Sequence, residues 1–298
     1  MSNKPAEWFG YLIENLPSTY VEEARNAAEG QKCPFLAAFY GHSDAKTSRC
    51  RKKTRLLDTP FGVCTAQVRG QAFLALCPYR FLENRRVFRD IALDYFQTLD
   101  NLIVYSEVTF PGASPIGRFD YVIVKHERVS NRVLDFVFVE FQAAQTTSTG
   151  ALVQAVRDMM QGKMENTYAF GINWADIWKR SLIQLLLKGA AAQRWGKVVY
   201  WVVQRQIFDN LVQRYGLQPS STPYDGPVRF LLYDLYQKPN APRLELKCTK
   251  ETASSFTLEA FYRGLQHLPN LPSLKEIERH LGRLLKQRLK LRVIPEMR

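Results

Sequence analysis

The chain has 298 residues, of which 46% are hydrophobic and 12% aromatic, so it has the apolar side chains of a folded protein and not of a disordered one. It carries 41 Lys and Arg residues against 28 Asp and Glu residues, and the net charge of +13 favours a polyanionic partner such as nucleic acid. No apolar run reaches the roughly 18–20 residues that span a membrane, and residues 1–10 lack the pattern of a secretion signal, so we expect a cytoplasmic protein that binds no membrane.

The first 85 residues differ from the rest, because they hold four of the five cysteines and little alternating apolar pattern. Apolar side chains at helical spacing, beginning with Trp8, predict a helix over residues 5–16 that ends before Pro17. A second short helix is predicted to follow, as far as about residue 28. Residues 31–80 are rich in small and basic residues, which predicts irregular structure.

From residue 86 onward, apolar strands and amphipathic helices follow one another, which is typical of an α/β protein. Strands are predicted at residues 102–110, 118–126, 133–144, 197–204 and 228–235, with an edge strand at 243–248. Helices are predicted at residues 86–99, 150–163, 175–194, 208–215 and 274–291. Because residues 133–144 are apolar on both faces, we expect a central strand there, in a mixed sheet flanked by helices. The apolar stretch 181–192 is interpreted as core or, alternatively, as an interface between two copies.

Two carboxylates mark the ends of neighbouring predicted strands. Asp120 begins one strand, and Glu140 and Gln142 lie two residues apart near the end of the next, so these two project from the same face. A hairpin between the strands places Asp120 beside Glu140, where hard oxygen ligands suit Mg²⁺, which lowers the pKa of a bound water. Alternatively, both carboxylates cap helices or face solvent, although the apolar run before Glu140 makes an unpaired charge unfavourable. His126, at the end of its strand, is an alternative general base.

Four cysteines lie close together in the sequence. They are Cys33, Cys50, Cys64 and Cys77. No CxxC pair occurs, so the spacing is not that of a common zinc finger, and disulfides are not expected in a cytosolic chain. The four thiols are either small buried apolar groups or the ligands of a closed tetrahedral Fe or Zn site, since both metals accept thiolates. His42 lies inside the same window and is an alternative ligand.

Basic residues gather in several places along the chain, each of which has a solvated charged surface as its alternative explanation. One run surrounds and follows the second cysteine: Arg49, Arg51, Lys52, Lys53 and Arg55. If a metal holds this segment, little conformational entropy is lost on binding, so we predict that this run contacts DNA. Arginine reads guanine through two hydrogen bonds in the major groove, which suits GC-rich sites. Another cluster lies on the last predicted helix, where the solvated surface is favoured.

These motifs support a resemblance. Asp120 followed by Glu140-X-Gln142 on the next strand is similar to the PD-(D/E)XK nuclease signature, with Gln142 in the place of lysine and no proline before Asp120. The order of a helix, three strands and a helix is also similar, and Glu107 on the first strand is a further acidic candidate for catalysis. With Cys33-Pro34-Phe35 and Cys77-Pro78-Tyr79 enclosing two more cysteines, the chain resembles the NotI family of type II restriction endonucleases.

The resemblance implies an α/β fold in which residues 86–298 form a PD-(D/E)XK core and residues 1–85 form a metal-binding, DNA-contacting segment. It implies that the four cysteines hold structural Fe or Zn, that Asp120 and Glu140 bind Mg²⁺, and that Gln142 completes the catalytic site. The expected function is a type II endonuclease that hydrolyses GC-rich palindromic double-stranded DNA by Mg²⁺-activated water. The expected state is a homodimer, with a cognate methyltransferase that protects host DNA.

Two other functions remain open from the sequence. A DNA-binding regulator with a structural metal and no catalysis predicts that Asp120 and Glu140 can both be replaced without loss of function. A nonspecific nuclease of the repair type predicts scattered cut ends.

Overall fold

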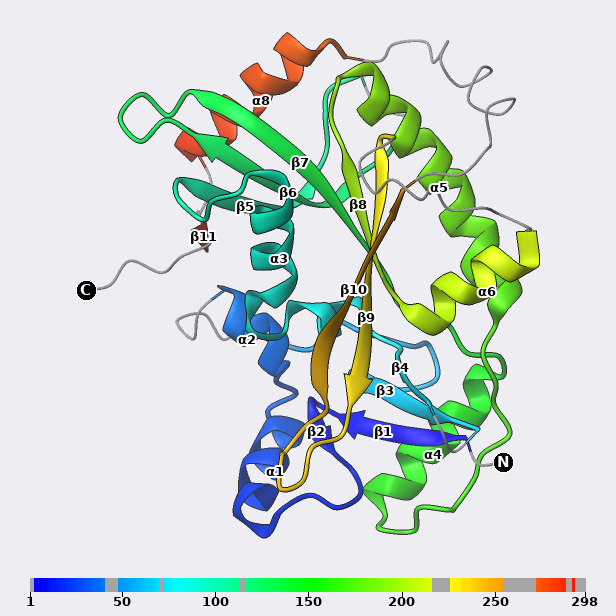
Figure 1. The fold of residues 1–298 in the computed structure, drawn as a ribbon. Coiled ribbons are helices and arrows are strands. Elements are labelled where there is room, and N and C mark those ends of the chain that lie inside the picture. The colour runs from blue at the N-terminus through cyan, green and yellow to red at the C-terminus, as the bar shows by residue number, and fades with distance from the viewer. Residues whose placement is uncertain are drawn as a thin grey trace. The chain divides into compact units, whose positions relative to one another are not determined.

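The computed structural model describes residues 3–40, 48–69, 72–112, 116–215, 226–254, 272–287 and 291–292. The chain divides into two compact units, each built from segments that are separate in the sequence. The first unit contains Met1–Arg85, Ala143–Ile177 and Tyr233–Thr249, and the second contains Arg86–Gln142, Trp178–Leu232 and Lys250–Arg298. Figure 1 shows the course of the chain through both units. In the part that the structure describes, no helix is both long and apolar enough to cross a bilayer.

The first unit contains a four-stranded antiparallel sheet with the strand order β2-β1-β3-β4. Its strands are β1 (Lys4–Trp8), β2 (Tyr11–Leu12), β3 (Val63–Val68) and β4 (Ala72–Ala75). Its helical segments are η1 (Ser18–Tyr20), α1 (Val21–Glu29), α2 (Pro34–Tyr40), η2 (Pro78–Arg85) and α4 (Thr149–Met160). The predicted short helix up to about residue 28 is confirmed as α1, whereas residues 31–80 are more regular than predicted, because α2, β3 and β4 lie within them.

The helix predicted over residues 5–16 is wrong, because this segment forms the β1–β2 hairpin. Trp8 pairs with Tyr11 across a two-residue turn, and both turn residues, Phe9 and Gly10, have positive φ angles of 47° and 81°. Tight hairpin turns of this kind favour glycine. Pairing of β1 with β3 along the sheet therefore overrides the helical spacing of the apolar residues.

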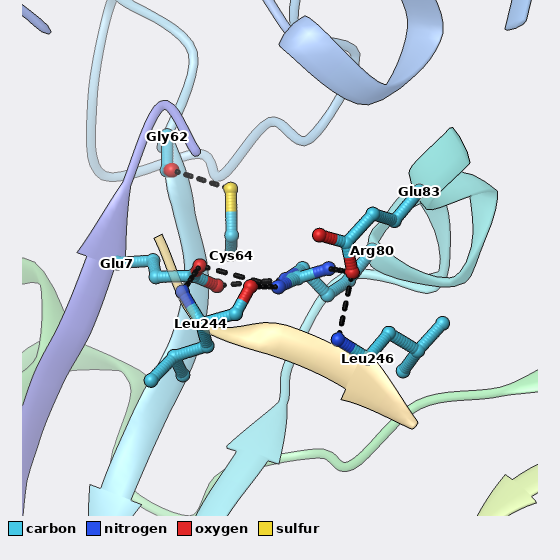
Figure 2. Close-up of polar contacts among 7 residues, drawn as sticks. All are labelled: Glu7, Gly62, Cys64, Arg80, Glu83, Leu244 and Leu246. Carbon is cyan, nitrogen blue, oxygen red and sulfur yellow. Dashed lines mark hydrogen bonds and ion pairs between the residues drawn. The ribbon is translucent and has the colours of Figure 1, made fainter. Parts of the chain in front are cut away.

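A buried ion-pair network around Arg80 joins distant parts of the first unit (Figure 2). Arg80 Nε donates to Glu7 Oε2 at 2.8 Å, and Arg80 Nη1 donates to Glu83 Oε2 at 2.9 Å. Arg80 Nη2 also donates to the Leu244 carbonyl oxygen. The backbone N–H groups of Leu244 and Leu246 donate to Glu7 and Glu83 at 2.9 and 2.8 Å. Because charges buried in this way need partners, the network ties η2 to β1 and to the start of β10.

The second unit contributes most strands of a seven-stranded mixed sheet with the order β10-β9-β8-β7-β6-β5-β11. The strands are β5 (Leu102–Val108), β6 (Phe119–His126), β7 (Val133–Gln142), β8 (Val199–Gln204), β9 (Val228–Tyr236), β10 (Glu245–Ser254) and β11 (Leu291–Arg292). Strands β5, β6 and β7 are antiparallel neighbours, and β7 and β8 are parallel. The predicted mixed sheet is confirmed, with β7 at its centre and Phe136–Phe141 buried.

Helices of the second unit cover both faces of the sheet near β7. They are α3 (Arg86–Tyr95), α5 (Trp174–Arg194), α6 (Arg205–Tyr215) and α8 (Leu274–Gln287). On one face, Phe88 of α3 packs against Phe141, with ring centroids 5.9 Å apart. On the other face, Phe138 packs against Trp195, just after α5, at 5.6 Å. The predicted flanking helices are therefore confirmed. The last helix, predicted to reach residue 291, ends at Gln287 within the described residues, residues 288–290 lie outside them, and β11 begins at Leu291.

Candidate functional site

Asp120 and Glu140 face each other at the ends of β6 and β7. Tyr121 pairs with Val139 in the antiparallel register, which puts Asp120 opposite Glu140. The backbone N–H of Asp120 donates to Glu140 Oε1 at 3.2 Å, and the N–H of Phe141 donates to Asp120 Oδ2 at 2.9 Å. Each carboxylate is thus held by a main-chain donor of the neighbouring strand, and the two residues lie side by side in the predicted hairpin.

The environment of this pair makes its negative charges unfavourable without a cation. Glu140 is only 3% exposed, and burial, followed by repulsion from Asp120, raises the pKa of its carboxyl to about 8. Burial also raises the pKa of Asp120, although the Phe141 N–H, Lys188 and Arg118 act in the opposite direction. Two carboxylates in these surroundings form a site of hard oxygen atoms that a small divalent cation would suit.

A lysine that the sequence analysis did not identify completes the surroundings of Glu140. Lys188 lies on α5 and is 2% exposed, and its Nζ lies 2.7 Å from Glu140 Oε2. The same ammonium group donates to the Arg118 carbonyl oxygen at 2.8 Å and lies 5.2 Å from the centre of the Phe119 ring. It lies in the apolar stretch that we interpreted as core or interface. The sequence did contain a signal for this role, since a lysine within a run of leucines and alanines is expected to be buried and a buried charge needs a partner.

Gln142 and Glu107 lie near the carboxylate pair, on β7 and β5. Gln142 points toward α5, and its Oε1 accepts a hydrogen bond from Ser181 Oγ. Glu107 has a positive φ of 55° and lies opposite Asp120 between two pairs that keep the same register, Ser106 with Tyr121 and Val108 with Phe119. Its carboxylate is close enough to contribute to the raised pKa of Asp120, and it forms an exposed ion pair with Arg118 at 3.4 Å. The structure therefore brings Glu107, Asp120, Glu140 and Gln142 to one region of the sheet.

His126, the alternative general base, lies at the other end of β6 from Asp120. Six residues of extended strand span about 20 Å, so its ring is far from the two carboxylates. Its Nδ1 lies 3.0 Å from the carbonyl oxygen of Glu127. This geometry favours a structural role for His126.

The four cysteines of the first unit lie in two backbone-linked pairs. The N–H of Cys50 donates to the carbonyl oxygen of Gln31, two residues before Cys33, at 2.8 Å. The N–H of Cys77 donates to the carbonyl oxygen of Cys64 at 3.3 Å, at the end of the β3–β4 hairpin. Main-chain pairing therefore brings together residues that the sequence separates.

The thiols lie within electrostatic reach of one another. Burial, followed by Cys77, raises the pKa of Cys33 to about 12, and the pKa values of Cys64 and Cys77 are also raised, chiefly by burial. Backbone N–H groups of the two residues that follow Pro34, and of the two that follow Pro78, favour the thiolates of Cys33 and Cys77.

The described residues give no support to the predicted four-cysteine Fe or Zn site. Among the described residues, no three or more His, Cys, Asp or Glu side chains form a group placed to hold a metal ion. The Sγ of Cys64 donates to the Gly62 carbonyl oxygen at 3.4 Å (Figure 2). His42 lies outside the described residues.

The basic run after Cys50 does not form one uniform surface. Arg49, Arg51, Lys53 and Arg55 are exposed. Lys52 instead turns inward: its ammonium donates to the Leu76 carbonyl oxygen and lies 5.6 Å from the centre of the Phe61 ring. Burial lowers the pKa of Lys52, whereas nearby cysteine thiols raise it. The ammonium of Lys52 is therefore directed toward the cysteines, while its neighbours face solvent.

Comparison with models of known protein families gives a match over residues 15–246 to the family described as restriction endonuclease NotI. The matched region contains all four clustered cysteines, both opposed carboxylates and Lys188. No curated protein and no solved structure matches the chain.

Proposed function

The chain belongs to the NotI restriction endonuclease family, and on that premise we propose that it is a type II enzyme that cleaves GC-rich palindromic double-stranded DNA with Mg²⁺. The observation that carries this proposal is the direct opposition of Asp120 and Glu140 across β6 and β7. Restriction endonucleases hydrolyse phosphodiesters, and two opposed carboxylates at strand ends are suited to hold the cation that such hydrolysis uses.

In this proposal Asp120 and Glu140 hold Mg²⁺ through hard carboxylate oxygens. When bound, Mg²⁺ lowers the pKa of a water molecule and neutralises charge on the phosphate under attack. Glu107 supplies a further carboxylate beside Asp120. Gln142, whose Oε1 accepts a hydrogen bond from Ser181 Oγ, completes the catalytic site. The succession of α3, β5, β6 and β7 supports a PD-(D/E)XK core within residues 86–298, although α4, which follows β7, belongs to the first unit.

Residues 1–85 supply a structural metal site and a DNA-contacting surface in this proposal. Cys33, Cys50, Cys64 and Cys77 hold Fe or Zn once their thiols are deprotonated, since soft thiolates suit both metals. The mutual electrostatic effect of these thiols supports this role. Deprotonation of Cys64 on metal binding removes the hydrogen bond that its thiol donates to Gly62.

Exposed Arg49, Arg51, Lys53 and Arg55 contact phosphates or bases, whereas Lys52 supports the cysteine segment. A palindromic site implies a homodimer with one active site for each strand, and host DNA then needs a cognate methyltransferase.

Cleavage of long, unmethylated, GC-rich DNA tests the proposal. Wild-type protein and Glu140→Ala are incubated with this DNA in Mg²⁺ and in EDTA. We expect discrete fragments from the wild type in Mg²⁺ only, and none from the variant. Sequencing the fragment ends then identifies the site. Scattered ends would point to a nonspecific nuclease, and DNA binding without cleavage by either protein would point to a regulator.

A further inference from the structure

In the PD-(D/E)XK signature the last position is typically a lysine, whereas this chain has the neutral amide of Gln142 there. The structure places a lysine at the same carboxylate from a different element. Lys188 reaches from α5 and forms a 2.7 Å ion pair with Glu140 Oε2. The other oxygen of Glu140 accepts the N–H of Asp120 at 3.2 Å, so both oxygens have a partner.

Two features distinguish Lys188 from an ordinary helix lysine. It is almost fully buried, and a charge in such a place is strongly unfavourable unless it is paired and hydrogen-bonded. Its ammonium also donates to the Arg118 carbonyl oxygen at 2.8 Å, two residues before Asp120. Lys188 therefore contacts the strand ends that carry both opposed carboxylates, and it is positively charged where Gln142 is neutral.

We propose that Lys188 is the lysine of this active site, a positioning residue that α5 supplies as the built-in counter-ion of Asp120 and Glu140. This inference rests on the function proposed above. In the free protein the ammonium balances part of the charge of the carboxylate pair. A divalent cation held by the pair would neutralise its two negative charges, and the ammonium of Lys188 would then leave a net positive charge beside the site.

This role has an electrostatic consequence that a purely structural lysine lacks. Above about pH 8, where Glu140 is ionised, Lys188 stabilises the empty, anionic pair more than the filled, neutral pair, because attraction depends on the net charge it faces. Removing its charge therefore strengthens binding of a divalent cation. The same change slows DNA cleavage, because positive charge beside the reacting phosphate is lost. Tighter metal binding together with slower hydrolysis is the signature of the counter-ion.

The test compares Lys188→Met, Lys188→Gln and Lys188→Arg with the wild type. Mg²⁺ binding to the DNA-free full-length protein is measured by isothermal titration calorimetry, and single-turnover cleavage is measured at saturating Mg²⁺. We expect Mg²⁺ to bind at least about tenfold more tightly to the two neutral variants, and cleavage to slow by about a hundredfold or more. Lys188→Arg keeps the charge, so its Mg²⁺ affinity stays near that of the wild type.

Lys197→Met is the matched control. Lys197 is also largely buried, pairs with Asp135 at 2.6 Å and lies 5.0 Å from the centre of the Phe136 ring, but it contacts neither opposed carboxylate. We expect this variant to bind Mg²⁺ and cleave DNA as the wild type does. Thermal unfolding of all variants shows whether each is folded, and Lys188→Gln, which keeps a donor for Arg118, serves if Lys188→Met is not.

If the neutral variants bind Mg²⁺ no more tightly than the wild type, or cleave at its rate, the counter-ion role is wrong. Failure of the proposed function itself looks different, because the wild-type protein would then cleave no DNA in Mg²⁺.

Discussion

Replacing Glu140 by glutamine changes how the stability of the protein depends on pH. Burial and Asp120 raise the pKa of the Glu140 carboxyl from its ordinary value of 4.5 to about 8 in the folded protein. The folded state therefore binds more protons than the unfolded state between these values. The contribution of Glu140 to stability is fully present below pH 4.5 and is lost as the pH rises through about 8. Glutamine does not titrate, so Glu140→Gln lacks this dependence.

The magnitude follows from the two pKa values. At 1.36 kcal/mol per pKa unit, the change from 4.5 to about 8 corresponds to at most about 5 kcal/mol between mildly acidic and mildly alkaline pH. We expect the free energy of unfolding of Glu140→Gln, relative to that of the wild type, to increase over this range by an appreciable part of that amount. The pH-dependent contributions of the other titratable groups are common to both proteins and cancel when the two free energies of unfolding are subtracted.

The assay is urea denaturation of both proteins in EDTA at several pH values from 5 to 9, followed by tryptophan fluorescence. Glu22→Gln, at an exposed position on α1, is the control and is expected to show a constant difference from the wild type. A difference between Glu140→Gln and the wild type that stays constant with pH, or that changes in the opposite direction, would show that folding does not raise the pKa of Glu140.

Arg80→Met is expected to lower the free energy of unfolding by about 3–5 kcal/mol, because it leaves Glu7 buried without its cation, and urea denaturation measures this. The purified wild type is expected to contain about one Fe or Zn ion per chain by elemental analysis, and Cys64→Ser to contain less; equal metal content would contradict the proposed ligand. Arg51→Ala is expected to reduce the salt dependence of DNA binding by about one unit of slope. The ammonium of Lys52 faces the cysteines, so Lys52→Met is expected to lower the melting temperature and to leave the salt dependence of DNA binding unchanged. A reduced salt dependence with an unchanged melting temperature would show that Lys52 contacts DNA.

Local patterns in the sequence determined much of the second unit. Alternating and continuous apolar runs predicted β5, β6, β7 and β8 and the helices around them. A strand buried on one face has alternating apolar residues, and a strand buried on both faces has a continuous apolar run. The opposition of Asp120 and Glu140 followed from the same patterns, since two successive strands joined by a short turn form a hairpin. Both residues of this site belong to adjacent strands, so their proximity is nearly a local property.

Which distant side chains meet depends on how the helices and strands pack in three dimensions. Residues 5–16 have helical spacing, yet they form strands because β3, far along the chain, pairs with them. Lys188 lies in an apolar stretch of the sequence, and its ion pair with Glu140 forms because α5 packs against the sheet. Nothing in the sequence distinguishes Lys52 from the basic residues beside it, but in the fold its ammonium points toward the cysteines. Periodicity reports which face of an element is buried, whereas ion pairs between elements depend on how those elements pack, and residue order does not contain that information locally.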